Sequence, residues 1–195
     1  MVLTAGATLI DFAGPWQMFV TPRTRSGTPR FQVYAVSDSV APVDLAGGLT
    51  VVPRHTLENA PSPDIVLVPA LGAGPYPSIV GWIRAMHARG AVIVSVCTGA
   101  FQLAEAGILD GLSATTHHDY QAELEREYPS VRALAGLRYA RSSPSIYTAG
   151  GLTSGIDLAL YLIQRILGVR TARAVAAYQE YEGQGWESGK ALRIP

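Results

Sequence analysis

The chain has 195 residues, of which 48% are hydrophobic and 15% are charged, as expected for one folded domain with a sizeable core. The 15 Lys and Arg residues balance 15 Asp and Glu residues, so the net charge indicates no attraction to nucleic acid or acidic membranes. A single cysteine excludes an internal disulfide and a thiolate-rich zinc site. No apolar run reaches the roughly 18 residues of a membrane span, and no signal-peptide pattern is visible. We therefore expect a single domain over residues 1–195, in the cytoplasm, where free thiols persist.

Strand-like apolar runs alternate with helical patterns along the chain. The pattern predicts strands at residues 2–4, 31–36, 64–69, 91–96, 113–116 and 145–149, and a small hairpin around residues 51–52. It predicts helices at 11–21, 78–89, 101–107, 118–127, 153–167 and 171–181, followed by a loosely ordered tail from residue 182. This alternation predicts an α/β fold that is doubly wound, with a mainly parallel sheet and helices on both faces. In such sheets a ligand site lies beyond the carboxyl ends of the strands.

Cys97 is the first candidate for chemistry, because it stands where the strand at 91–96 turns sharply into a helix. Such a corner exposes the sulfur and directs a helix N-terminus at it, which would favour the thiolate. Ser and Cys elbows of this kind recur in hydrolytic enzymes. The alternative is a buried cysteine that acts only as a small hydrophobic residue.

Asp11 is the second candidate, since a carboxylate among apolar neighbours is costly unless it has a partner. The alternative is a helix N-cap, because Asp11 precedes Gly14-Pro15, where we place the helix start. If the first and central strands are neighbours, Asp11 and Cys97 meet across a crevice and share a proton. The Thr98 N–H then lies where oxyanion donors are found, while its hydroxyl either caps the helix or contacts a substrate.

Further polar and glycine-rich positions follow the other strands. His117 pairs with the thiol or is structural, and the adjacent His118 and Asp119 form at most a weak metal site. Asp157 lies inside an apolar helix, and its role stays open. The turns at the strand ends are expected to contact a small-molecule substrate. The residues predicted to do so are Gly72, His117, Gly150, Gly151 and Leu152.

Four blocks of sequence resemble the ThiJ/PfpI superfamily, whose fold is similar to class I glutamine amidotransferases and to flavodoxin. They are LIDFAGP at 9–15, VSVCTGA at 94–100, ATTH at 114–117 and TAGGLTSGID at 148–157. Within the superfamily the chain is most similar to isonitrile hydratases and to the amidase-like domain of AraC-type regulators. Many other members carry a glutamate at the position of Asp11. The turn at 69–72 reads PALG, where PGG is commoner.

The resemblance implies an enzyme that hydrates an isonitrile to an N-substituted formamide through a thioimidate on Cys97. Asp11 would be the acid/base partner and Thr98 a neighbour in the site. It also implies a homodimer, with no cofactor and no metal. Two alternatives remain: a non-catalytic small-molecule sensor, and other thiol chemistry of glyoxalase-like, amidase-like or oxidation-sensing type. DNA binding by this chain alone is not expected, because its charge is balanced.

Overall fold

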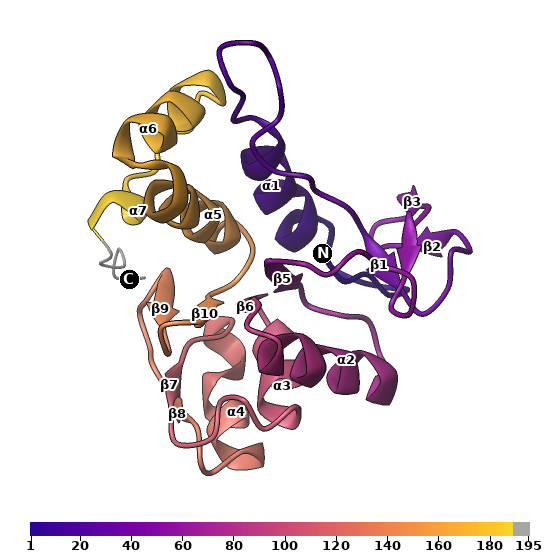
Figure 1. The fold of residues 1–195 in the computed structure, drawn as a ribbon. Helices are drawn as coiled ribbons and strands as arrows, with labels where there is room; N and C mark the ends of the chain where they lie inside the picture. Colours follow the sequence, from indigo (N-terminus) through magenta and orange to yellow (C-terminus); the bar gives the residue numbers. More distant parts are fainter. Residues whose placement is uncertain (189–195) are drawn as a thin grey trace.

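The structure is a computed structural model that describes residues 1–188, and a four-stranded sheet lies at its centre (Figure 1). The first three strands run parallel, and the last is antiparallel to its neighbour. In spatial order they are β5 (Ile65–Val68), β6 (Val92–Val96), β10 (Ile146–Ala149) and β9 (Tyr139–Arg141). The carboxyl ends of three parallel strands therefore meet at one edge, where the sequence places the site.

The start of the chain extends this sheet beyond β5. The Val2 N–H donates to the Leu67 carbonyl at 2.9 Å, and the Leu3 N–H donates to the Val36 carbonyl at 2.8 Å. The predicted first strand therefore lies between β5 and β1 (Val36–Ser37), which pairs in parallel with β4 (His55–Thr56). This order places the residues that follow the first strand close to the end of the central strands.

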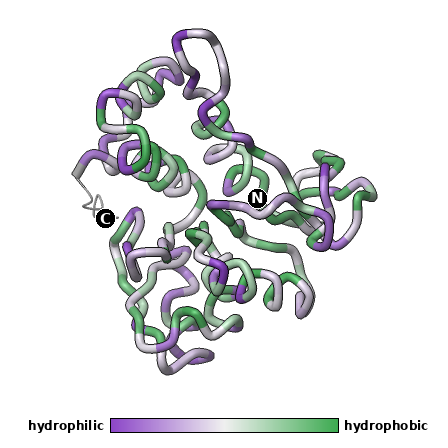
Figure 2. The backbone as a smooth tube through the Cα atoms, viewed as in Figure 1, coloured by the Kyte–Doolittle hydropathy of each residue, from purple (hydrophilic) through white to green (hydrophobic). Residues whose placement is uncertain are grey.

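Helices cover both faces of the sheet, so the doubly wound prediction is confirmed. On one face, Ile79, Ile83 and Leu103 pack with Val66 and Ile93. On the other, Met18, Leu158 and Leu162 pack with Leu67 and Val94. The helices are α1 (Leu9–Val20), α2 (Pro77–Ala88), α3 (Gly99–Glu105), α4 (Gln121–Glu127), α5 (Ser154–Leu167), α6 (Val169–Tyr178) and α7 (Gly185–Ser188). Figure 2 shows the strongly hydrophobic chain at the centre of the molecule, where these strands lie. Within residues 1–188, no helix combines the length and the apolar character required to cross a bilayer.

Several predicted boundaries were wrong for local reasons. Helix α1 begins at Leu9 and runs through Gly14 and Pro15, so these two residues do not start it. The strand predicted at 31–36 is reduced to β1, and His118–Tyr120 forms a 3₁₀ turn before α4. The pattern gave no sign of β9 or of β8 (Arg132–Ala133), which pairs with β7 (Ser113–Ala114). The predicted small hairpin is present as β2 (Val43–Asp44) and β3 (Thr50–Val51).

The segment after residue 182 is better ordered than its polarity predicts. Trp186 on α7 is only 3% exposed and packs into the same core as α5 and α6. A buried Trp side chain helps to anchor this short helix, because aromatic side chains bury a large apolar area. The remaining part of the predicted tail, residues 189–195, lies outside the described residues.

Helices α1 and α5 cross closely because glycine stands at the contact. A Cβ on Gly14 would lie 2.9 Å from Cγ1 of Ile156. A Cβ on Gly155 would lie 3.0 Å from Pro15 and from Val96 at the end of β6. The crossing therefore holds the first turns of α1 against the point where β6 ends.

Candidate active site

Cys97 occupies a strained elbow between β6 and α3. Its φ is 59°, a left-handed conformation that is rare for a residue with a side chain. Its N–H donates to the carbonyls of Ala149 and Gly150 at 3.1 and 2.9 Å, and its own carbonyl accepts from Thr116 Oγ1 at 2.8 Å. A Cβ on Gly99 would collide with the Val68 carbonyl, so only glycine permits this turn. The elbow predicted from the sequence is present.

The structure brings Asp11 of α1 to this thiol. The residue is completely buried, and its Oδ2 accepts the Ala70 N–H at 3.1 Å. Its Oδ1 makes no hydrogen bond of ordinary geometry. The Cys97 side chain and the Leu152 N–H lie close enough to stabilise the carboxylate. Because Asp11 is the third residue of α1, its carboxyl does not cap the helix N-terminus, and the N-cap alternative was wrong.

Burial dominates the electrostatics of both groups. It raises the pKa of Asp11 from 3.8 to about 6, although the Ala70 N–H, the Cys97 thiol and the Leu152 N–H each lower it. Burial, followed by the negative charge of Asp11, raises the pKa of Cys97 to about 12. The N–H groups of Thr98 and Leu152 oppose this increase without cancelling it. The expected thiolate was therefore wrong: near neutral pH the pair consists of a protonated thiol and a mostly ionised carboxylate.

The neighbouring turns place main-chain donors around the pair. Thr98 is the N-cap of α3, but its side chain makes no capping hydrogen bond. Its N–H is directed at the Cys97 sulfur. Leu152 has a φ of 54°, and its N–H faces both Asp11 and Cys97. In the turn after β5 the donor is Ala70, which the sequence interpretation missed. Gly72 instead packs against the Ala5 carbonyl and donates to Thr4 Oγ1 at 3.2 Å.

His117 lies at the edge of the same site. Its ring rests on Gly151 so closely that a Cβ there would overlap it. Thr116, the preceding residue, binds the Cys97 carbonyl, so this strand end is tied to the elbow. Gly150 and Gly151 are therefore part of the wall of the site, because one accepts from the Cys97 N–H and the other supports the imidazole.

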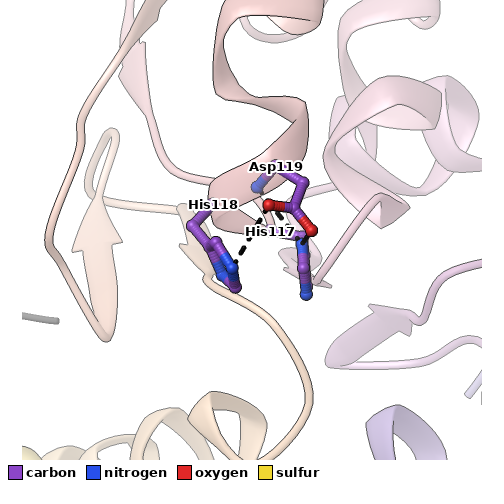
Figure 3. A group of neighbouring side chains, drawn as sticks. All are labelled: His117, His118 and Asp119. Carbon is purple, nitrogen blue, oxygen red and sulfur yellow. Dashed lines mark hydrogen bonds and ion pairs between the residues drawn. The ribbon is translucent and has the colours of Figure 1, made fainter. Parts of the chain in front are cut away.

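His117, His118 and Asp119 form a cluster whose possible ligand atoms lie within 4.8 Å of one another (Figure 3). The two rings stack, with centroids 4.3 Å apart and planes 27° from parallel. An imidazole nitrogen binds a metal in the plane of its ring, so two stacked rings do not direct their lone pairs at one ion. Asp119 also uses its N–H on His117 Nδ1 at 3.3 Å. The cluster is better described as a turn of mutually bonded polar residues.

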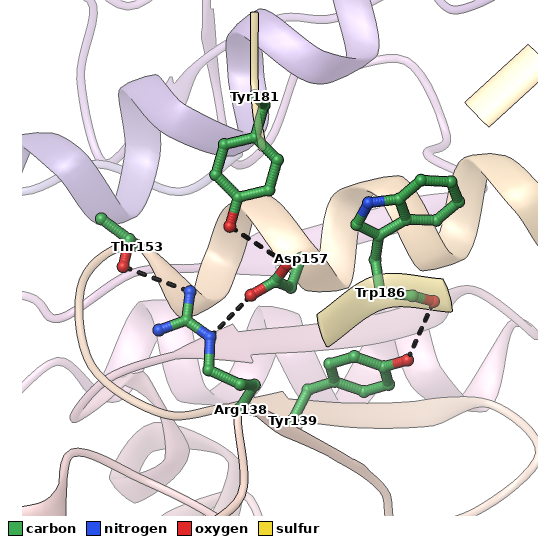
Figure 4. Close-up of polar contacts among 6 residues, drawn as sticks. All are labelled: Arg138, Tyr139, Thr153, Asp157, Tyr181 and Trp186. Carbon is green, nitrogen blue, oxygen red and sulfur yellow. Dashed lines mark hydrogen bonds and ion pairs between the residues drawn. The ribbon is translucent and has the colours of Figure 1, made fainter. Parts of the chain in front are cut away.

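Asp157 belongs to a polar network behind the Gly150–Leu152 turn (Figure 4). Its Oδ2 accepts from Arg138 Nε at 2.6 Å, and its Oδ1 accepts from the Tyr181 hydroxyl at 3.1 Å. Burial raises the pKa of Tyr181 to about 12, with the Asp157 charge as the next cause. The sequence interpretation singled out Asp157 but missed both partners, because one precedes the unpredicted β9 and the other lies at the end of the chain's last predicted helix.

Cys97 is only 7% exposed. A cavity of about 470 Å³ lies between α1 and α6, and one of about 510 Å³ lies near Met1, Phe31 and Trp82. Neither of these two is lined by Asp11 or Cys97. With 7% of the residue exposed, the sulfur can be reached by a small or narrow group.

The fold and the site define the class of this protein. It is an α/β protein with a doubly wound sheet, a cysteine on a strand-to-helix elbow, and a buried carboxyl from the first helix beside that cysteine. The profile of the DJ-1/PfpI family matches residues 1–165. The chain therefore belongs to the DJ-1/PfpI family. The family assignment agrees with the resemblance inferred from the four sequence blocks.

Two of the similar proteins have different functions. The chain is 34% identical over 177 residues to an isonitrile hydratase from Pseudomonas putida, covering 88% of this chain and 73% of that protein. It is 28% identical over 179 residues to the HTH-type transcriptional regulator GbdR of Pseudomonas aeruginosa, covering 90% of this chain. This chain spans only about half of the regulator, 48% of its length.

Solved structures show the same fold. A ThiJ/PfpI family protein from Pseudomonas syringae matches with a TM-score of 0.79 and 25% identity, covering 94% of this chain and 74% of that one. An AraC family transcriptional regulator from Pseudomonas putida matches with a TM-score of 0.78 and 21% identity, covering 91% and 96%. Both likenesses support the flavodoxin-like architecture.

Proposed function

We propose that the protein hydrates a small isonitrile to an N-substituted formamide, with Cys97 as nucleophile and Asp11 as proton carrier. The observation that carries this proposal is the contact between a protonated thiol at a strained elbow and a buried carboxylate that can remove its proton. The similarity to the isonitrile hydratase of Pseudomonas putida supports the choice of substrate.

The first half of the reaction adds the thiol to the terminal carbon of the isonitrile. Asp11 takes the thiol proton as the sulfur–carbon bond forms, then delivers that proton to the same carbon. The product is a thioimidate in which the carbon carries sulfur, hydrogen and a double bond to nitrogen. Because the pKa of Asp11 is raised to about 6, its carboxyl can both accept and return a proton near neutral pH.

The second half adds water to the carbon–nitrogen double bond. Asp11 removes one proton from the water, and the nitrogen gains a proton, giving a tetrahedral carbon that carries sulfur, hydroxyl and amine. The carbon–sulfur bond then breaks, the hydroxyl becomes the formyl oxygen, and its proton returns to sulfur. Isonitrile and water are consumed, formamide is released, and the thiol is restored.

The surroundings of the sulfur fit this substrate class. The N–H groups of Thr98 and Leu152 stabilise negative charge on the sulfur, which develops during attack and during release. The isocyano group is linear and two atoms long, so its terminal carbon can reach a sulfur whose residue is 7% exposed. In this proposal His117, Gly150 and Gly151 contact the rest of the substrate. Gly72 remains a proposed substrate contact, although its described contacts are with residues 4 and 5.

The test is formamide production from a panel of alkyl and aryl isonitriles by the purified protein. Wild type should form product, while Cys97→Ala and Asp11→Asn should form none above background. An exposed-site variant such as Asp38→Asn serves as the matched control and should keep full activity. Turnover that survives in either site variant would disprove the mechanism.

A sensor function is the second candidate, because the chain also resembles the transcriptional regulator GbdR. A sensor would bind a metabolite tightly without converting it. Calorimetry with the same isonitriles, alongside product analysis, separates the two functions. Parallel assays with α-oxoaldehydes and amides test glyoxalase-like and amidase-like thiol chemistry.

The expected assembly and partners remain proposals. We propose a homodimer, which light scattering of the purified chain would reveal as twice the mass of 20.7 kDa. We also expect no affinity for DNA, since Lys and Arg only balance Asp and Glu, and a mobility-shift assay tests this expectation.

A further inference from the structure

The turn between β10 and α5 is attached at both ends to one residue, Arg138. Before the turn, the Gly150 N–H donates to the Arg138 carbonyl at 2.9 Å. After the turn, Arg138 Nη2 donates to Thr153 Oγ1 at 3.2 Å. Between these two attachments lies Leu152, whose N–H faces the Asp11 carboxyl and the Cys97 thiol.

The side chain of Arg138 is itself fixed by a buried carboxylate. Its Nε donates to Asp157 Oδ2 at 2.6 Å, and the two side chains are 19% and 2% exposed. Tyr181 holds the other oxygen of Asp157, and a Cβ on Gly185 would lie 3.1 Å from that carboxylate. One guanidinium nitrogen therefore binds Asp157 in α5, and another binds Thr153 at the end of the turn (Figure 4).

The turn needs such support because its conformation is unfavourable on its own. Leu152 has a φ of 54° and a side chain that is 45% exposed, so packing alone holds it weakly. A turn that relaxed toward an ordinary conformation would rotate the Leu152 N–H away from the acid–thiol pair.

We propose that Arg138 is a positioning residue that clamps the turn from Gly150 to Thr153 and so keeps the Leu152 N–H directed at Asp11 and Cys97. The ionisable groups around the pair are His117 against Gly151 and, behind the turn, Arg138, Asp157 and Tyr181. Within residues 1–188, no described contact joins Arg138, Asp157 or Tyr181 to the thiol or to the Asp11 carboxyl. The turn is therefore the described connection between these three residues and the acid–thiol pair. This role of Arg138 rests on the proposed function of the site, but the titration of the Asp11 carboxyl that tests it does not require turnover.

The decisive variant is Thr153→Val, which removes the hydroxyl that the guanidinium holds and leaves the Arg138–Asp157 pair in place. The measurement is the titration midpoint of the Asp11 carboxyl by ¹³C NMR, assigned with Asp11→Asn. Because the Leu152 N–H lowers the pKa of Asp11, losing it should raise the midpoint measurably above that of the wild type. Alkylation of Cys97 at a fixed alkaline pH should become slower in the same variant.

Two comparisons separate positioning from general stability. Thr153→Ser keeps the hydroxyl and should restore the wild-type midpoint. Arg173→Met removes an arginine from an exposed ion pair with Glu187, away from the turn, and should leave the midpoint unchanged. An unchanged midpoint in folded Thr153→Val would overturn the proposal even if the protein proves to be an active hydratase. A raised midpoint would support it even if no isonitrile is converted.

Discussion

The imidazole ring of His117 lies directly on the backbone of Gly151, so that the end of one strand and the turn after another close the same side of the site. A side chain at position 151 would occupy the space of that ring. The contact makes a substitution at Gly151 a sensitive probe of the wall around Cys97.

We expect Gly151→Ala to impair the site and to lower the free energy of unfolding by about 1–3 kcal/mol, because His117 must move or the turn must shift. Urea denaturation measures the loss. The matched control is Gly81→Ala, on α2, where a Cβ meets nothing within 4 Å. That control should gain about 0.5–1 kcal/mol, since alanine favours a helix interior. Equal effects of the two substitutions would contradict the close contact.

Asp11→Asn should stabilise the fold at neutral pH while removing activity. The raised pKa of Asp11 means that the stability contribution is complete below pH 3.8 and is lost as pH rises through about 6. The shift corresponds to about 3 kcal/mol, so the variant should gain up to that amount at pH 7 and nothing at pH 3.5. Denaturation at several pH values tests this, with exposed Asp38→Asn expected to follow wild type throughout. A variant less stable than wild type at pH 7 would refute the argument.

Cys97 should react slowly with iodoacetamide in the folded protein. Its pKa is raised to about 12 and its residue is 7% exposed, so little thiolate is available near pH 8. We expect a rate at least about tenfold below that of an ordinary free thiol, whose pKa is about 8.5. The same protein unfolded in urea provides the control and should react normally. A folded rate equal to the unfolded rate would show that burial does not control this thiol.

Arg138→Met should destabilise the protein by about 3–5 kcal/mol, because the Asp157 carboxylate is then left buried without its cation. Adding Asp157→Leu should recover most of this loss, since the stranded charge is removed. Arg173→Met, which breaks an exposed ion pair, should cost no more than about 1 kcal/mol. Thermal unfolding of the three variants distinguishes a buried pair from a surface pair, and three equal effects would argue against the network.

The strand, elbow and helix around Cys97 were predictable because the pattern there is local. A six-residue run at 91–96 with five apolar residues, followed by Cys-Thr-Gly, leaves few alternatives to a buried strand that turns into a helix. Asp11 was singled out by its apolar neighbours, and the family resemblance added its role as the acid/base partner of Cys97, which is far away in the chain. Local features supported the N-cap alternative equally well, and the observed start of α1 at Leu9 decides between them.

The ionisation of the pair could not be predicted from the sequence. A helix start beside a cysteine suggests a thiolate, but α3 has only 7 residues and its contribution is small against burial. Burial depends on every side chain that packs around the sulfur, which no short motif contains. Arg138 and Tyr181 were missed for a similar reason: their contacts with Asp157 form only once β9 and the last helices are in place.

The close crossing of α1 and α5 depends on two glycines, Gly14 and Gly155, whose side chains are single hydrogen atoms. A methyl group at Gly14 would press on Ile156, and one at Gly155 on Pro15 and Val96. We expect either to shift α1 against α5, and Asp11 with it. A larger residue at either position should therefore separate Asp11 from Cys97, although neither of these two reacting residues is itself substituted.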